Sequence, residues 1–133
     1  MAGISPKLPL VVSPKDGVFD MIVEAEEALL QDLQMVIFTE PGEKMMQPSF
    51  GVGLKRFLFE PATPIVYENI SSEIYTQVAR YLPRIKIQNI RFNETAGSPQ
   101  SPDLRIDSAL TSITLEYSIT PLAKINSLVI PIP

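Results

Sequence analysis

The sequence predicts an α+β fold in which three helices pack on a small antiparallel sheet, with extended arms at both ends. Apolar residues recur at three- and four-residue spacing through the first two thirds of the chain, which is the helical period. After Pro83 the period changes to two, as is typical of half-buried strands. Thirteen prolines must lie in turns, helix starts and extended segments, because proline breaks the interior of helices and strands.

Composition narrows the classes of function. A chain of 133 residues supports one domain with a core. Its 11 basic and 15 acidic residues give a net charge of -4, which argues against nucleic acid as a partner. The absence of cysteine excludes disulfides and thiolate metal sites, and a reducing cytoplasm is compatible with folding. The sequence has no run of about 18 apolar residues that could span a membrane, so we expect no membrane partner. We also expect no cofactor.

The first elements are an arm and a helix. Prolines and an Asp16-Gly17 turn pair predict that residues 1–19 form an extended arm. Apolar residues at helical spacing then predict a helix over 20–36, with Asp20 as its N-cap. The following residues, 36–39, form a short β-prone run that ends at Pro41-Gly42.

Two further helices are predicted beyond that turn. Pro48 opens a second turn, and Phe50, Leu54, Phe57 and Leu58 follow at helical spacing, which predicts a short helix over 50–59. Thr63 and Pro64 are a strong helix start, because threonine caps free amides and proline at the first position loses no hydrogen bond. This helix is expected over 63–82 and to end before Pro83.

The last third predicts a hairpin and a tail. Alternation predicts strands over 85–93, with a bulge near Asn89, and over 112–120. Residues 94–102 between them are predicted to be a loop, and residues 103–110 could be loop or strand. The C-terminal tail, residues 122–133, is apolar and extended; it could pack on its own domain or be lent to another chain. The expected organisation is therefore an arm (1–19), a domain (20–121) and a tail (122–133).

With these elements placed, short motifs in a fixed order become informative. They are Thr39 with Pro41-Gly42-Glu43, then Pro48 with Phe50-Gly51 and Leu54, then Phe59-Glu60 with Thr63-Pro64, and finally Tyr81 with Pro83-Arg84-Ile85. Each motif alone would occur by chance, but their order and spacing over about residues 20–120 are not common. The sequence resembles the baseplate wedge and sheath-initiator family of contractile phage tails, also called the GPW or lysozyme-like baseplate family, which is related to a type VI secretion baseplate component.

The resemblance implies a structural protein and no enzyme. It implies a part of the virion tail baseplate, assembled in the host cytoplasm, on which sheath subunits start to polymerise by strand addition. The implied partners are other baseplate wedge proteins with their helical core bundle, sheath subunits, and tube or hub proteins. The family has a Glu-Pro-Arg triplet that docks on this bundle, whereas this chain has Leu82-Pro83-Arg84, so only Pro83 and Arg84 carry the implied role.

The residues expected to contact partners lie at that corner and on the strands after it: Tyr81, Pro83, Arg84, Ile113, Leu115, Tyr117, Leu128, Val129 and Ile130. A second set is expected to be structural: Pro41, Gly42, Glu43, Pro48, Phe50, Gly51, Leu54 and Phe59. One of the adjacent pair Met45 and Met46 is also a candidate for touching a partner, because both cannot face inward in an extended segment.

Two other functions are alternatives. A peptidoglycan hydrolase would need two carboxylates around a glycosidic bond, and Glu40 and Glu43 flank a turn. Acids this close in a tight turn seldom enclose a sugar, so solvated turn acids, with Glu43 fixing the turn, are the favoured interpretation. A small adaptor domain unrelated to tails is the remaining alternative.

Overall fold

The structure is a computed structural model that describes residues 3–12, 18–61, 63–95, 109–121 and 124–131. The chain divides into two compact units, Met1–Met35 and Val36–Pro133, and each is described by itself. The predicted division into arm, domain and tail at residues 19 and 121 stays a prediction.

In the first unit the N-terminal segment pairs with the residues that precede helix α1. Strands β1 (Ser5–Pro6) and β2 (Met21–Ile22) are antiparallel. The Ile4 amide donates to the Ile22 carbonyl at 2.7 Å, and the Lys7 amide donates to the Asp20 carbonyl at 2.9 Å. The N-terminal segment is therefore held by main-chain hydrogen bonds.

Helix α1 (Ala25–Phe38) begins later than predicted. Asp20 is not its N-cap, because the Asp20 amide donates to Val11 and the Asp20 carbonyl accepts from Lys7 in the pairing with the N-terminal segment. Within the first unit, the Gln31 side chain accepts a hydrogen bond from the Leu8 amide at 2.9 Å and donates to the Pro6 carbonyl at 3.2 Å. A long-range pairing has thus replaced the first helical turn that local sequence favoured.

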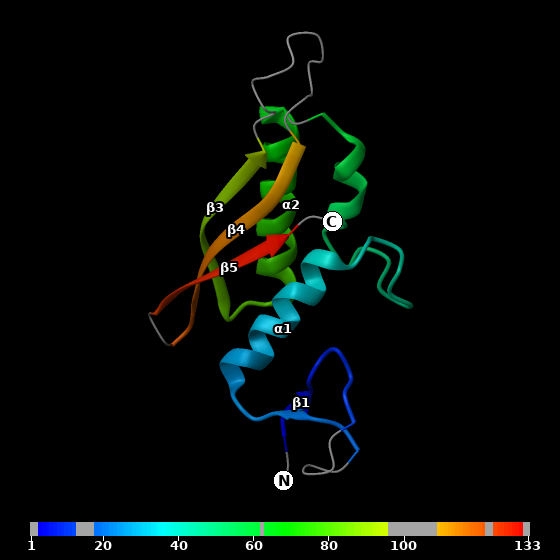
Figure 1. The fold of residues 1–133 in the computed structure, drawn as a ribbon, viewed down its shortest axis with the longest axis vertical. Coiled ribbons are helices and arrows are strands. Elements are labelled where there is room, and N and C mark those ends of the chain that lie inside the picture. The colour runs from blue at the N-terminus through cyan, green and yellow to red at the C-terminus, as the bar shows by residue number, and fades with distance from the viewer. Residues whose placement is uncertain (1–2, 13–17, 62, 96–108, 122–123, 132–133) are drawn as a thin grey trace. The chain divides into compact units, whose positions relative to one another are not determined.

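The second unit contains a three-stranded antiparallel sheet in the order β3-β4-β5, with α2 behind it in Figure 1. Its strands are β3 (Ile85–Thr95), β4 (Ala109–Ile119) and β5 (Ile125–Pro131). The predicted antiparallel pair and the predicted bulge are confirmed: β3 and β4 pair from Ile85 opposite Ile119, with a register shift between Ile87 and Asn89. The loop predicted for 94–102 lies mostly outside the described residues.

Helix α2 (Pro64–Tyr81) begins where Thr63 and Pro64 predict. The Thr63 hydroxyl accepts from the Val66 amide at 3.4 Å. One face of α2 is buried, and β4 and β5 contribute alternate side chains to the core. The buried apolar residues of the unit are Val36, Ile37, Val52, Leu54, Val66, Ile70, Ile74, Val78, Ile85, Ile113, Leu115, Tyr117, Ile119, Leu128 and Ile130.

The prediction of three helices is wrong. The described chain has two α-helices, and residues 50–59 contain only a short 3-10 helix, η1 (Leu54–Phe59). Two glycines with positive φ, Gly51 at 105° and Gly53 at 69°, precede it. The Val52 amide donates to the Val36 carbonyl at 3.0 Å, and the Gly53 amide donates to the Thr39 carbonyl at 3.0 Å. The Val52 and Gly53 amides thus satisfy carbonyls at and just beyond the C-terminus of α1, and the left-handed φ values of Gly51 and Gly53 keep this segment out of a right-handed helix.

The β-prone run at 36–39 is also different from the prediction, because α1 continues to Phe38. The C-terminal segment, for which two arrangements were open, forms β5 on its own chain. It pairs with β4 from Ser112 opposite Pro131 to Ser118 opposite Ile125, without a register shift.

Candidate functional site

The segment between α1 and η1 is a chain of three tight turns. The Glu43 amide donates to the Glu40 carbonyl at 3.1 Å, the Gln47 amide to Lys44 at 3.3 Å, and the Phe50 amide to Gln47 at 3.1 Å. The Glu43 carboxylate accepts the Glu40 amide at 2.9 Å, so this acid fixes the first turn. We call residues 40–50 the triple-turn loop.

The buried side chain of Gln77 anchors this loop to α2. Its Oε1 accepts from the Gly51 amide at 3.1 Å, and its Nε2 donates to the Ser49 carbonyl at 3.0 Å. Gln77 is 6% exposed and is the buried polar residue of the described core. Sequence reasoning missed it, although a glutamine on the apolar stripe of α2, beside Ile74 and Val78, was a visible signal.

Gly51 is required by close packing as well as by its φ of 105°. A Cβ at this position would lie 2.1 Å from the Thr39 carbonyl oxygen, which no side chain can tolerate. At Gly53 the corresponding contact is with Pro41 Cδ at 2.8 Å. The Pro41-Gly42 turn and the Gly51–Gly53 segment therefore pack against each other.

The loop lies against the C-terminal end of α2. Phe50 meets Tyr81 edge-on, with ring centroids 4.8 Å apart, and Ser49 Oγ lies 3.4 Å from the Tyr81 hydroxyl. Arg80 donates to Ser49 Oγ at 3.4 Å. The structure thus brings together Phe50, from the predicted structural set, and Tyr81, from the predicted partner set. The role of Tyr81 in partner binding stays a prediction.

The corner after α2 is fixed by main-chain hydrogen bonds. The Ile85 amide donates to the Leu82 carbonyl at 3.0 Å, and the Thr120 amide donates to the Arg84 carbonyl at 2.9 Å. Leu82 is half-buried, whereas Pro83 and Arg84 are exposed. An apolar residue at position 82 is compatible with that partial burial, and the arginine is presented to solvent on a defined backbone.

The strand residues expected to contact partners divide into two groups. Val129 is 58% exposed. The side chains of Ile113, Leu115, Tyr117, Leu128 and Ile130 are buried in the core of the chain itself. Alternation identified both faces of these strands, but it could not say that α2 covers the apolar one. A direct partner contact by these five side chains is not compatible with their burial here.

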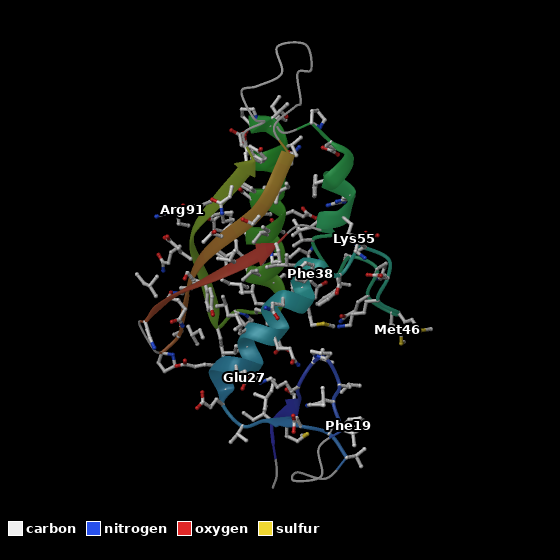
Figure 2. All side chains as sticks on the ribbon, viewed as in Figure 1. Phe19, Glu27, Phe38, Met46, Lys55 and Arg91 are labelled. Carbon is white, nitrogen blue, oxygen red and sulfur yellow. The ribbon has the colours of Figure 1, made fainter. Side chains whose placement is uncertain are left out.

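The other face of the sheet carries polar side chains joined across strands. Gln88 donates to Ser118 at 3.0 Å, and Asn93 donates to Ser112 at 3.0 Å and to Thr114 at 3.2 Å. Arg91 pairs with Glu116 at 3.0 Å. Figure 2 shows Arg91 directed away from the sheet. On β5 this face is instead apolar, with Ile125 66% and Val129 58% exposed.

The remaining structural residues lie near the loop. Pro41, Gly42, Glu43 and Pro48 are exposed turn residues, and Leu54 is buried at the start of η1. Phe59 ends η1, and its side chain lies outside the described part of the chain. Their structural role, as a set, stays a prediction.

A second cluster joins the start of α2 to the end of β3. The Tyr67 ring stacks on Phe92 with centroids 4.7 Å apart, and its hydroxyl donates to the Glu94 carboxylate. Burial, followed by this hydrogen bond and the charge of Glu94, raises the pKa of Tyr67 to about 12. The ring stacking and the hydroxyl–carboxylate hydrogen bond both join a residue of α2 to residues of β3, so this cluster holds α2 against the sheet.

The described residues contain no cluster of three or more His, Cys, Asp or Glu side chains that could hold a metal ion. Within the same residues no helix has the length and apolar character of a membrane span. Glu40 and Glu43 sit in one tight turn, with Glu43 exposed and its carboxylate bonded to the Glu40 amide.

Comparison with known proteins identifies the family. The family model for baseplate wedge protein gp25 matches residues 23–119, which is well over half of the chain. The chain belongs to the baseplate wedge protein gp25 family. The predicted resemblance is confirmed, and the chain is a structural protein of contractile tail baseplates that assembles with other baseplate proteins. No curated protein sequence matches the chain.

Three solved structures share the fold. A Geobacter sulfurreducens protein provisionally described as a tail lysozyme is 22% identical, with a TM-score of 0.62, over 85% of this chain and 94% of that one. A chain of the anti-feeding prophage baseplate is 24% identical, with a TM-score of 0.56, over 92% and 78% of the two chains. A chain of the postcontracted pyocin R2 baseplate is 18% identical, with a TM-score of 0.55, over 83% and 97%. Identities this low support a shared fold. Family membership removes the alternative of an adaptor unrelated to tails.

Proposed function

We propose that this gp25-family chain starts sheath assembly by offering the outer edge of β5 to a strand from a sheath subunit. The observation that carries this proposal is the regularity of that edge. In the order β3-β4-β5, both outer strands have one unpaired side among the described residues. An added strand gains main-chain hydrogen bonds from such an edge and side-chain specificity from alternate residues.

The two outer strands are not equivalent as templates. Strand β3 has register shifts between Ile87 and Asn89 and between Asn93 and Glu94. Bulges of this kind disrupt pairing and twist an edge away from a new strand. Strand β5 pairs with β4 along its whole length without a shift. An incoming strand therefore finds a continuous backbone at β5.

Exposed apolar side chains support the same edge. Ile125 is 66% and Val129 58% exposed, on the face away from Leu128 and Ile130. Covering two such side chains contributes up to about 1.5–3 kcal/mol each, if burial is complete. Long edges with exposed apolar residues favour aggregation when they have no partner. A sheath strand at this edge would cover exposed apolar surface and would also pair the edge that otherwise favours aggregation.

Docking on the neighbouring wedge proteins is assigned to the Pro83-Arg84 corner. Arg84 is exposed and forms no ion pair with another described residue. Its own backbone is held in place, because its carbonyl accepts a hydrogen bond from the Thr120 amide. Its rigid five-donor guanidinium suits carboxylates and helix C-termini of a helical bundle. Tube or hub proteins are further proposed neighbours. We also propose that the protein assembles in the host cytoplasm and has no catalytic activity.

Two substitutions separate these roles. We expect Val129→Asp to leave baseplates complete but without sheath, because a charge on the β5 edge opposes strand addition. Asn89→Asp on β3 is the control, since the oxygen that accepts the Ile90 amide is retained. Arg84→Glu is expected to prevent incorporation into baseplates. Electron microscopy of the particles measures both effects, and normal sheaths on Val129→Asp baseplates would reject the edge assignment.

A further inference from the structure

Two cations of the second unit lie on adjoining aromatic rings. Lys44 Nζ lies 4.1 Å from the Phe50 ring centroid, and Arg80 Cζ lies 5.3 Å from the Tyr81 centroid. The two rings contact each other at 4.8 Å. We call these four residues the cation-aromatic row. A cation over a ring is stabilised by about 0.5–1 kcal/mol at an exposed site, so both charges are held in place.

Neither cation of this row has a carboxylate partner among the described residues. Three other cations do have one: Lys7 pairs with Glu27, Arg56 with Glu73, and Arg91 with Glu116. Glu40 and Glu43 lie in the same loop as Lys44, but neither forms an ion pair with Lys44 or Arg80. Both cations can therefore pair with carboxylates of another protein, and such charge complementarity favours an acidic partner.

Beside Lys44 the triple-turn loop exposes two methionines. Met45 is 89% and Met46 99% exposed, and Figure 2 shows Met46 at the end of the projecting loop. Met46 also has a φ of 66°, at a turn position where glycine or asparagine is usual. That conformation costs about 1–2 kcal/mol for a side chain with a Cβ. Local stability therefore does not explain methionine here.

The loop that carries these methionines is fixed in position. Gln77 bonds Ser49 and Gly51 from the core, and Glu43 closes the first turn. A fixed loop loses little conformational freedom on binding. Methionine side chains are flexible and polarizable, and they adapt to an apolar surface on another protein.

We propose that the cation-aromatic row and Met45-Met46 together bind an acidic segment of another baseplate protein, with carboxylates meeting Lys44 and Arg80 and apolar side chains meeting the methionines. This inference rests on the proposed function, because it adds a second docking surface beside the Pro83-Arg84 corner. Nucleic acid is disfavoured as occupant, because two cations on a net acidic chain neutralise few phosphates.

Photo-crosslinking in assembled particles tests the proposal. Met45 is replaced by p-benzoylphenylalanine in the full chain, and crosslinked peptides are identified by mass spectrometry. The expected crosslink is to a segment of another baseplate protein with Asp or Glu within a few residues. Crosslinks to a segment without acids, or to a second copy of this chain through its acidic helix α1, would overturn the proposal.

Substitutions give the matched comparison. We expect Lys44→Glu to lower the crosslink yield roughly tenfold, since like charges then face each other. Lys55→Glu, an equal charge change at another exposed lysine, should leave the yield unchanged. Reversing the crosslinked acid to lysine should restore the yield with Lys44→Glu. Equal yields from Lys44→Glu and wild type would overturn the proposal.

Met46→Gly separates binding from folding. Glycine removes the strain at φ 66°, so this variant should unfold at a temperature no more than a few degrees from wild type, yet crosslink several-fold less. Unchanged crosslinking by Met46→Gly would show that the methionine has no part in docking. If the chain is absent from baseplates altogether, the proposed function fails; if baseplates and sheaths form normally and only the crosslink prediction fails, this inference alone is wrong.

Discussion

Gln77 and Gly51 are joined by a hydrogen bond of 3.1 Å between the buried amide oxygen of α2 and the main-chain N–H of the loop. The same amide also donates to Ser49 at 3.0 Å, so one side chain positions both ends of the Ser49–Gly51 segment. Gln77 therefore holds the Ser49–Gly51 segment in a fixed position on α2, the helix that leads to the Pro83-Arg84 corner.

Replacing Gln77 with leucine should destabilise the fold. The change leaves the Gly51 amide without its partner, and a buried unsatisfied group costs about 1–3 kcal/mol. We expect the free energy of unfolding, measured by urea denaturation, to fall by about 2–4 kcal/mol for both lost bonds. Thr76→Ala, an exposed neighbour that bonds only the Ser72 carbonyl of its own helix, is the control. A Gln77→Leu variant as stable as Thr76→Ala would contradict this anchoring role.

A pair of glycine substitutions separates backbone strain from steric clash. Gly42 and Gly51 have similar φ values, 94° and 105°, but only Gly51 lies against another backbone. Gly42→Ala should cost about 1 kcal/mol from strain alone. Gly51→Ala should cost more than about 3 kcal/mol, because its Cβ overlaps the Thr39 carbonyl. Equal melting temperatures for the two variants would show that the Thr39 contact relaxes freely.

The stability contributed by Tyr67 should depend on pH. Its pKa is about 12 in the folded chain, against about 10 for an unperturbed tyrosine. The raised pKa means that this contribution is complete below pH 10 and is lost as the pH rises from about 10 to 12. Tyr67→Phe should remove this alkaline loss, as followed by thermal unfolding of the two proteins across that range. Parallel pH profiles would argue against the Tyr67–Glu94 bond.

We predict no cell-wall hydrolysis by this chain. In a turbidity assay on purified peptidoglycan, wild type and Glu43→Gln should both match the buffer control, because the Glu43 carboxylate holds the Glu40 amide in an exposed turn. Wild-type activity that disappears in Glu43→Gln would instead support the hydrolase alternative. A catalytically dead point variant of a known lysozyme and its active form serve as assay controls.

Local sequence predicted the parts of the fold that depend on local chemistry. Thr63-Pro64 placed the start of α2, and strict alternation over Ile113–Ile119 placed β4. The bulge near Asn89 was visible because the apolar alternation slips there. These features are set by capping, proline geometry and period, which a sequence displays directly.

The remaining features depend on long-range pairing. Asp20 looked like an N-cap, but its backbone pairs with Lys7 and Val11. Residues 50–59 had helical spacing, but the amides of Val52 and Gly53 donate to the carbonyls of Val36 and Thr39, and Gly51 and Gly53 have positive φ. Of the candidate site, Pro83 and Arg84 are exposed, and their role in docking stays a prediction. Gln77 and the cation-aromatic row became visible only when α2 and the loop were brought together.

The most direct test of the central claim is a density map of the assembled particle at a resolution that traces strands. We predict a strand from a sheath subunit hydrogen-bonded to the outer edge of Ile125–Pro131 and covering Val129. A β5 edge that faces solvent, or a sheath strand added at β3 instead, would contradict it.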